Sequence, residues 1–292
     1  MKIGIITRNE NGWCTIQLRK AIEKRRMIPF CFSFSQLVAR VRAAPATTVD
    51  EADITKELNA LIMRPIGRGS LEEIIFRMDL LHRLQRLGMV IVNPPLAIER
   101  AVDKFHTVAL LEENGIPVPR TVATESVEEA LRAFFELGGD VVVKPIFGSR
   151  GIGSTRISDA EVATRVFRTL SFHHMVLYVQ EFVRHGVSDI RAFVVGDRVV
   201  AAMRRVAEGW KTNVSLGAKP TPLKLDESLE RLAVKASSVI DCKVAGVDIL
   251  ESERGPVVVE LNSQPGWRGL QSVTEVNIAD EIVGFVLSEL KR

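Results

Sequence analysis

Three oxygen-bearing side chains near the end of the chain have the types and the spacing of a metal site. Asp248 lies in one β-rich run, and Glu260 and Asn262 lie two residues apart in the next run, beyond the polar turn 251–256. If the runs pair as a hairpin about Arg254, Asp248 comes opposite Glu260, and Glu260 and Asn262 share a face because side chains alternate along a strand. Two carboxylates and an amide oxygen suit magnesium, whose charge offsets the repulsion between the acids. A solvated hairpin with incidental acids is the alternative.

A second motif, farther upstream, has the chemistry to bind phosphate. The apolar run 141–143 ends in Lys144 and is followed by the glycine-rich loop 148–154. Glycines let backbone N–H groups approach an anion, and a lysine at a strand end supplies a positive charge from a fixed base. The spacing G-x-x-G-x-G matches neither the dinucleotide fingerprint nor a P-loop, which ends in Gly-Lys-Ser/Thr. The loop therefore predicts a phosphate site outside those two classes, with a plain glycine turn as the alternative.

Taken in order along the chain, these motifs and several others resemble those of the ATP-grasp ligases. The matching segments are 103–104, 115–121, 144–154, 180–183, 189–196 and 260–263. Within that superfamily the chain is similar to the RimK-like α-L-glutamate ligases, over roughly residues 60–292. The resemblance implies a mixed α/β and α+β fold of the ATP-grasp type, with an N-terminal parallel α/β lobe and two lobes that clamp ATP.

The resemblance also implies a role for individual residues. The segment 180–183 would form the hinge that binds the adenine edge, and Asp189 would lie near the nucleotide sugar. Magnesium would be held by Asp248, Glu260 and Asn262, with two ions expected and manganese as a substitute. The full set of expected ATP-binding residues is Lys104, Lys144, Ser149, Gly151, Gln180, Glu181, Phe182, Val183, Asp189, Lys211 and Asn213.

Two arginines are the expected catalytic residues. Arg191 and Arg204 lie on consecutive predicted strands, where a guanidinium group can stabilise the charge on a transferred phosphoryl group. The sequence alone does not distinguish Arg204 from its neighbour Arg205. Residues 211–213 are Lys-Thr-Asn, where the RimK-like pattern more often has Arg-Ser-Asn, so the charge is kept but the bidentate fork is lost.

Four residues are candidates for binding the substrates. Arg64 and Arg68 flank a short loop that precedes a predicted helix, and two arginines there suit an anionic acceptor such as a glutamyl tail. Trp267 and Arg268 follow Asn262 in a glycine-containing segment and have side chains that can stack on or pair with a ligand. A purely structural loop at 64–69 is equally compatible with the sequence.

The activity that the resemblance implies is ATP-dependent formation of an amide bond. An acceptor carboxylate would attack the γ-phosphate to give an acyl phosphate, and the amine of L-glutamate would then displace phosphate. Segments 103–105 and 265–271 are closer to the ligases that add glutamate to one-carbon coenzymes, such as a tetrahydromethanopterin-type pterin. The alternatives are glutamylation of a ribosomal-protein C-terminus, another ATP-grasp amino-acid ligase, and a non-catalytic nucleotide-binding module, against which the intact acids argue.

Composition excludes several other classes. The 292 residues carry a net charge of only +3, which argues against a nucleic-acid partner. No apolar run reaches the length of a membrane helix, so no membrane partner is expected. The cysteines Cys14, Cys31 and Cys242 are too widely spaced for a zinc site or a disulfide framework. We therefore expect a cytoplasmic protein. The resemblance allows a homo-oligomer, because members of the family commonly assemble as dimers or tetramers.

The elements that must position these residues can be predicted from periodicity. Strands are expected at 2–7, 30–34, 60–63 and 89–92, with helices at 15–26 and 71–87 between them, and this alternation predicts a parallel α/β lobe. Further helices are expected at 101–113 and 126–137. The rigid Asn-Pro-Pro at 93–95 is the best boundary. It gives the predicted domains 1–95 (N-terminal lobe), 96–183 (central and lid part) and 184–292 (C-terminal part with the magnesium site).

Overall fold

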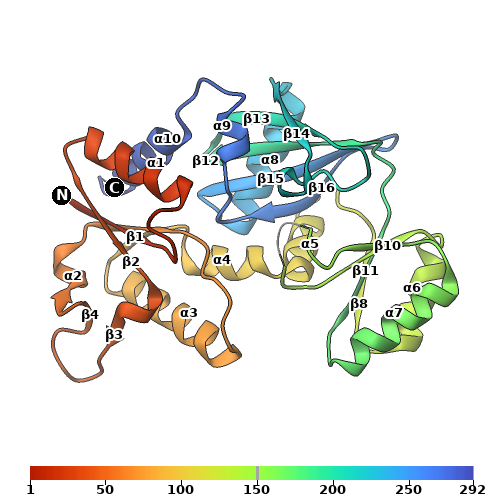
Figure 1. Ribbon diagram of the computed structural model, residues 1–292, viewed down its shortest axis with the longest axis horizontal. Helices are drawn as coiled ribbons and strands as arrows, with labels where there is room; N and C mark the ends of the chain where they lie inside the picture. The colour runs from red at the N-terminus through yellow and green to blue at the C-terminus, as the bar shows by residue number, and fades with distance from the viewer. Residues whose placement is uncertain (149–150, 292) are drawn as a thin grey trace.

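The computed structural model describes residues 1–148 and 151–291, in which four β-sheets are arranged as three lobes along one long axis (Figure 1). The N-terminal lobe lies at one end, the lid at the other, and the C-terminal sheet between them. This is the mixed α/β architecture expected from the sequence. Ser149 lies outside the described residues. In the described part, no helix is long and apolar enough to cross a membrane.

The N-terminal lobe is built on a parallel sheet with strand order β2-β1-β6-β7. Its central strands β1 and β6 are short apolar runs that are buried almost throughout, as parallel strands covered by helices require. The helix α3 begins with a capping box between Ser70 and Glu73, which satisfies two backbone N–H groups at its start. The elements are β1 (Lys2–Ile6), α1 (Trp13–Lys24), β2 (Ile28–Phe32), β6 (Ala60–Met63), α3 (Leu71–Arg86) and β7 (Val90–Val92).

A small antiparallel sheet, which the sequence did not predict, is inserted between β2 and β6. It has the order β3-β4-β5 and packs through Leu37 and Val49 against the core of the N-terminal lobe. The elements of this insertion are η1 (Phe34–Gln36), β3 (Leu37–Ala39), β4 (Thr47–Val49), β5 (Ala52–Asp53) and α2 (Ile54–Glu57).

The lid is an antiparallel sheet of order β10-β9-β11-β8, covered by two helices. Phe134 and Phe167, one from each helix, are buried against Val141, Val143 and Val179 of the sheet. The elements are β8 (Thr121–Thr124), α6 (Val127–Glu136), β9 (Val141–Lys144), β10 (Thr155–Ile157), α7 (Ala160–Phe172) and β11 (Leu177–Glu181).

The C-terminal sheet has the order β14-β13-β12-β15-β16, with antiparallel pairing throughout. One face is covered by α8 together with α4 and α5, which come from the segment before the lid. The elements are β12 (Ser188–Val195), β13 (Arg198–Val206), η2 (Val214–Leu216), β14 (Lys219–Leu223), α8 (Glu227–Ile240), β15 (Val244–Ser252), β16 (Gly255–Asn262), α9 (Arg268–Gln271) and α10 (Ile278–Glu289).

The segment after the Asn-Pro-Pro break differs from the prediction in two respects. The predicted helix 101–113 is two helices, α4 (Pro95–Val102) and α5 (Lys104–Glu113), because Asp103 accepts a hydrogen bond from the His106 N–H and caps the second helix. Ala97 and Leu111 of these helices are buried in the core of the C-terminal sheet. The segment 96–118 therefore packs with the C-terminal part, whereas the predicted boundaries grouped it with the lid.

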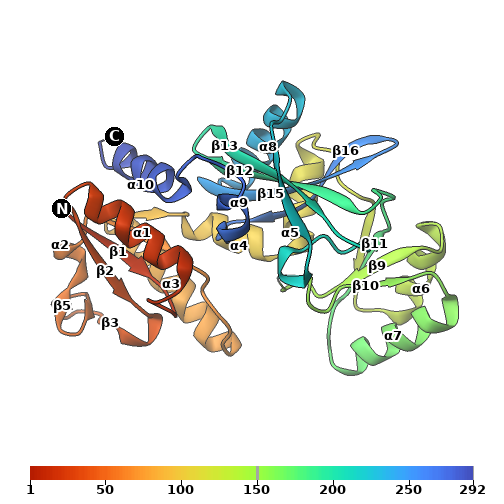
Figure 2. The same cartoon turned by 45° about the horizontal axis from the view of Figure 1, so that its top comes forward.

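The two ends of the chain join the N-terminal lobe to the C-terminal sheet. Helix α10 runs along α1, as both views show (Figure 2), and the two share one core with Phe193 of β12. The buried side chain of Asn93 strengthens this junction, because its Oδ1 accepts from the N–H groups of Lys243 (2.7 Å) and Val244 (2.8 Å). The N-terminal lobe and the C-terminal sheet therefore form one continuous body.

Candidate active site

A cleft between the lid and the C-terminal sheet collects most of the residues predicted to bind nucleotide. It encloses about 870 Å³, counting the space that is open to solvent. The predicted residues that line it are Lys104, Lys144, Gly151, Gln180, Glu181, Phe182, Val183, Asp189, Lys211, Asn213, Asp248 and Glu260. These residues, which are far apart in the sequence, meet there because β9, β11, β12, β15 and β16 all contribute to the walls of the cleft.

Two lysines face the acids, Lys144 from the lid and Lys104 from the start of α5. Lys144, the last residue of β9, donates a hydrogen bond from Nζ to Gln180 Oε1 at 2.6 Å. Desolvation lowers the pKa of Lys144 to about 8, although the charge of Glu260 opposes this shift. Lys104, at the start of α5, donates from Nζ to the carbonyl of Gly148 at 2.8 Å and lies 3.6 Å from Glu260 Oε1. Both ammonium groups can pair with an anion in the cleft.

Gly151, in the described part of the glycine-rich segment, lies against the opposite wall of the cleft. Gly151 has a φ of +70°, and a Cβ at this position would lie 2.5 Å from Oδ1 of Asn213. Only glycine allows both the left-handed backbone and this close approach. Gly151 and Asn213, which are about 60 residues apart in the sequence, are thus brought together.

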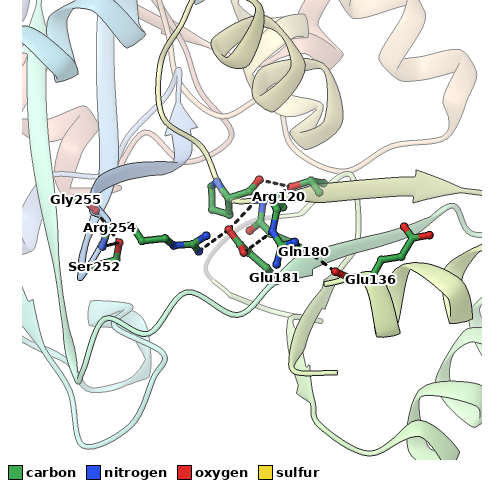
Figure 3. Close-up of polar contacts among 9 residues, drawn as sticks. Arg120, Glu136, Gln180, Glu181, Ser252, Arg254 and Gly255 are labelled. Atoms are coloured by element: carbon green, nitrogen blue, oxygen red, sulfur yellow. Dashed lines mark hydrogen bonds and ion pairs between the residues drawn. The ribbon is translucent and has the colours of Figure 1, made fainter. Parts of the chain in front are cut away.

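The predicted hinge is held by a carboxylate that has arginines on two sides. Glu181 Oε2 accepts from Arg120 Nε at 2.9 Å, and Glu181 Oε1 lies 3.1 Å from Arg254 Nη2, which reaches across from the β15–β16 turn (Figure 3). Burial alone would raise the pKa of Glu181, but hydrogen bonds from Arg120 and Arg254 lower it below its usual range. The backbone adds a bond from Glu181 N–H to the Arg120 carbonyl at 2.9 Å. The hinge is therefore fixed before any ligand binds.

Aromatic and cationic side chains stack on one another beside the hinge. The guanidinium of Arg156 lies 3.6 Å from the centre of the Phe182 ring, and Trp210 meets the same ring edge-on at 6.0 Å. The ammonium of Lys211 lies 5.2 Å from the Trp210 ring. This cluster forms an apolar wall with positive charge at its rim, a surface suited to a planar base that carries phosphates.

The acids lie where the hairpin prediction placed them. Asp248 and Glu260 are register partners across β15 and β16, and Asn262 faces Gly246 two residues farther along. Both Asp248 oxygens accept from Arg191, through Nε and through Nη2 (2.7 Å to Oδ2). Burial alone would raise the pKa of Asp248, but the charges of Arg191 and Arg205 lower it. Asp248 is therefore ionised and clamped.

The choice that the sequence left open between Arg204 and Arg205 is settled by strand register. Asp189 of β12 lies opposite Arg205, which donates to both Asp189 oxygens and reaches Asp248 Oδ2 at 3.1 Å. Adjacent residues on a strand point to opposite faces, so Arg204 points away and pairs with Glu251. The prediction of Arg204 in the site is corrected to Arg205, whose side chain is buried beside the acids.

The donor set of the predicted metal site fits magnesium. Glu260 and Asn262 share a face of β16, and Asp248 Oδ1, which accepts one hydrogen bond from Arg191, has a second lone pair for a cation. Within the described ranges, no three His, Cys, Asp or Glu side chains gather into a metal site. A cation there would accordingly take the Asn262 amide oxygen and oxygens of the substrate as further ligands, which is magnesium's usual arrangement.

The four predicted substrate-binding residues divide into two pairs. Arg68 and Arg268 are exposed. Arg64 stacks over the ring of Trp267, with its Cζ 4.9 Å from the ring centre, and donates from Nη1 to the Pro265 carbonyl at 3.2 Å.

The expectation that Trp267 stacks on a ligand is corrected by its burial. The side chain is 1% exposed, and its ring packs edge-on against Trp13 at 6.3 Å and Phe193 at 6.2 Å. No face of the ring is open to a ligand, so Trp267 belongs to the core that joins the N-terminal lobe to the C-terminal sheet.

Comparisons with known proteins agree with this architecture. Residues 101–286 match the family model described as the RimK-like ATP-grasp domain. The chain is 40% identical to the tetrahydromethanopterin:alpha-L-glutamate ligase of Methanocaldococcus jannaschii over 298 residues, all of both chains, and 35% identical to that of Methanococcus maripaludis over 296 residues, all of this chain and 99% of the relative.

Solved structures agree at the level of the fold. The RimK domain protein ATP-grasp from Sphaerobacter thermophilus matches with a TM-score of 0.77 at 21% identity, over 98% of this chain and 100% of that one. The ATP-grasp ligase PsnB complexed with minimal precursor matches with a TM-score of 0.79 at 19% identity, over 99% and 98% of the two chains.

Proposed function

The chain belongs to the RimK-like ATP-grasp family of ligases, and from this premise we propose that it joins L-glutamate to a carboxylate of a tetrahydromethanopterin-type pterin, driven by ATP. The observation that carries the proposal is the full-length similarity to two ligases named for that reaction, at 35% and 40% identity. Because the match includes the N-terminal lobe as well as the ATP-grasp part, it supports the acceptor as well as the chemistry. ATP and glutamate are intracellular metabolites, so we place the reaction in the cytoplasm.

The cleft supports the nucleotide half of the proposal. The adenine ring would lie along Phe182 with its edge at the hinge 180–183, and the phosphates would lie toward Lys144 and Lys104 beside the glycine loop. Since Lys144 is already desolvated, its interaction with phosphate is stronger than that of a surface lysine. Arg191 and Arg205 would place positive charge behind Asp248, close to the transferred phosphoryl group.

Magnesium would be held by Asp248, Glu260 and Asn262, and we propose two ions, as the charge of a triphosphate favours. When bound, the metal neutralises the β- and γ-phosphate oxygens. The residues of the chain position the reactants: an acceptor carboxylate oxygen attacks the γ-phosphorus, ADP leaves, and an acyl phosphate forms. The amine of glutamate then attacks the acyl carbon, phosphate leaves, and the amine loses a proton to give the amide.

The test is a reconstituted reaction with purified protein, ATP, magnesium, L-glutamate and tetrahydromethanopterin. We expect ADP release and a gain of one or more glutamyl residues in the mass of the pterin. Parallel reactions would replace glutamate with each other amino acid, and the pterin with a peptide from a ribosomal-protein C-terminus. Extension of the peptide with an unchanged pterin, or equal turnover with another amino acid, would refute the proposed acceptor or the proposed donor.

A further inference from the structure

Arg64 lies in the junction between the N-terminal lobe and the C-terminal sheet without an acidic partner. It follows β6, stacks on Trp267, and donates one hydrogen bond to the Pro265 carbonyl. No carboxylate of the described residues forms an ion pair with it, whereas Arg191 and Arg205 are both paired with acids. Burial lowers the pKa of Arg64. A desolvated cation without a counterion is unfavourable, and a bound anion would relieve that cost.

Unpartnered donors gather in the segment that Arg64 touches. Four buried side-chain atoms of the described chain lack a hydrogen-bond partner, and three of them are Asn262 Nδ2, Gln264 Nε2 and Trp267 Nε1. All three are N–H donors within six residues, and the indole N–H has no acceptor role at all. Buried polar groups in native proteins are almost always hydrogen-bonded, so three orphans in one segment indicate a missing acceptor.

The surrounding charges favour an anion at the same place. Arg8 follows β1 and Arg68 follows β6, and these strands are parallel neighbours, so both arginines emerge at the carboxyl edge of the N-terminal sheet. Ligands of open α/β sheets bind at that edge. Neither Arg8 nor Arg68 forms an ion pair within the described residues, and the same holds for Arg268 on the other side of the junction.

This region adjoins the proposed centre of phosphoryl transfer. A Cβ placed on Gly246 would lie 3.0 Å from Pro265 Cβ and 3.1 Å from Nη1 of Arg191, the residue that clamps Asp248. Pro265 in turn accepts the hydrogen bond from Arg64. Pro265 and Arg191 therefore connect Arg64 to Asp248, so a substrate bound at Arg64 lies near the acids.

We infer that Arg64 and Gln264, with the amide N–H of Asn262, form a subsite for a carboxylate that does not itself react. The inference rests on the proposed function, in which both acid substrates carry carboxylates besides the reacting groups. A planar carboxylate offers two oxygens with two lone pairs each, which matches a guanidinium fork together with the two amide N–H donors of Gln264 and Asn262. The subsite would hold one end of the substrate while its other end reaches the γ-phosphate.

Two conservative variants test the subsite by steady-state kinetics with ATP, L-glutamate and tetrahydromethanopterin. Arg64→Lys keeps the charge but loses the fork, and Gln264→Leu keeps the volume but removes one donor. We expect Arg64→Lys to raise KM for one of the two carboxylate substrates about tenfold to a hundredfold, as loss of a charge-assisted bond does. KM for ATP should stay within about twofold of the wild type.

The arms of this experiment identify the source of the carboxylate. A rise in KM for the pterin alone assigns it to the acceptor, and a rise in KM for glutamate alone assigns it to the amino acid. Thr47→Val is the matched control for Gln264→Leu, because it removes the fourth unpartnered atom, which lies in the small N-terminal sheet. Arg231→Lys, on the surface of α8, is the control for Arg64→Lys.

A binding measurement tests the subsite independently of which acceptor the enzyme uses. Calorimetric titration with glutarate, in the presence of ADP and magnesium, should show binding to the wild type that Arg64→Lys and Gln264→Leu weaken and that both controls retain. This result would stand even if the pterin were not the acceptor. Unchanged KM values together with unchanged glutarate affinity in both variants would overturn the inference, as would an equal rise in KM for ATP.

Discussion

Two groups of arginines in this molecule differ in how their charges are satisfied. Beside the acids of the C-terminal sheet, Arg191 and Arg205 are bonded to both oxygens of Asp248 or Asp189. At the junction with the N-terminal lobe, Arg64 is bonded only to a backbone carbonyl. The first group can hold its geometry without a ligand, because every charge has a partner. The second group lacks a counterion, as expected of a site that binds an anionic ligand.

The comparison predicts a large loss of stability when an arginine of the first group is removed and a small change when Arg64 is removed. Arg205→Met would leave Asp189 buried without its partner, and we expect it to destabilise the protein by about 3–5 kcal/mol. Urea unfolding measures this change. In the double variant Arg205→Met with Asp189→Leu, much of the stability should return, since no buried charge is left alone. A loss below about 1 kcal/mol in Arg205→Met would break the comparison on the paired side.

Glu260→Gln, beside the paired arginines, is expected to change catalysis without changing stability. Glu260 is partly exposed, and among the described residues it forms a single ion pair, with Lys104 at 3.6 Å, so the fold should tolerate a neutral isostere. We expect ATP-dependent turnover to fall by about 100-fold or more, because an anionic ligand of the proposed magnesium site is lost. ADP release at saturating substrate measures the change, and urea unfolding checks the fold. Wild-type turnover would remove Glu260 from the proposed metal site.

The pH dependence of nucleotide binding reports on Lys144. Its pKa of about 8 lies below the ordinary value for lysine, so the ammonium form is lost as pH rises through 8. If Lys144 must be charged to bind phosphate, KM for ATP should rise about tenfold per pH unit above that point, while remaining flat from pH 6 to 7. The same depressed pKa makes the folded protein gain stability as pH rises from 8 toward the unfolded value near 10.5.

Lys144→Arg is the control for that profile. A guanidinium stays charged over the whole range, so the alkaline rise in KM should move beyond pH 10 in this variant. An unchanged alkaline limb would show that another group controls it.

The smallest effect is expected where the charge has no partner. Arg64→Met removes a desolvated cation and keeps most of the apolar contact with Trp267, so the unfolding free energy without ligand should change by less than about 1 kcal/mol. Urea unfolding, done beside Arg205→Met, gives the contrast directly. Equal destabilisation by the two variants would mean that Arg64 is a structural residue.

The sequence predicted those strands and turns that are determined by short runs of neighbouring residues. The strand Ala60–Met63 has the predicted bounds, and the β15–β16 hairpin has the predicted pairing of Asp248 with Glu260, because apolar runs and a polar turn determine both. The sheet β3–β5 was missed, since its strands are two or three residues long and show no periodicity.

The site residues that sequence reasoning misplaced depend on partners far away in the chain. Either Arg204 or Arg205 had to face the acids, and only the register with Asp189 decides which. Trp267 is buried by Trp13 of the N-terminal lobe and Phe193 of the C-terminal sheet, which no local pattern reveals. Arg254 was identified only as a turn residue, and its contact with Glu181 follows from how the lid meets the hairpin.

The bond between the Glu181 N–H and the Arg120 carbonyl joins the two points at which the chain enters and leaves the lid. A unit whose ends meet in this way can change in size without moving the strands that carry Asp248 and Glu260. Related enzymes can therefore gain or lose lid residues, and so alter how tightly nucleotide is enclosed, while the chemistry on the neighbouring sheet is inherited intact.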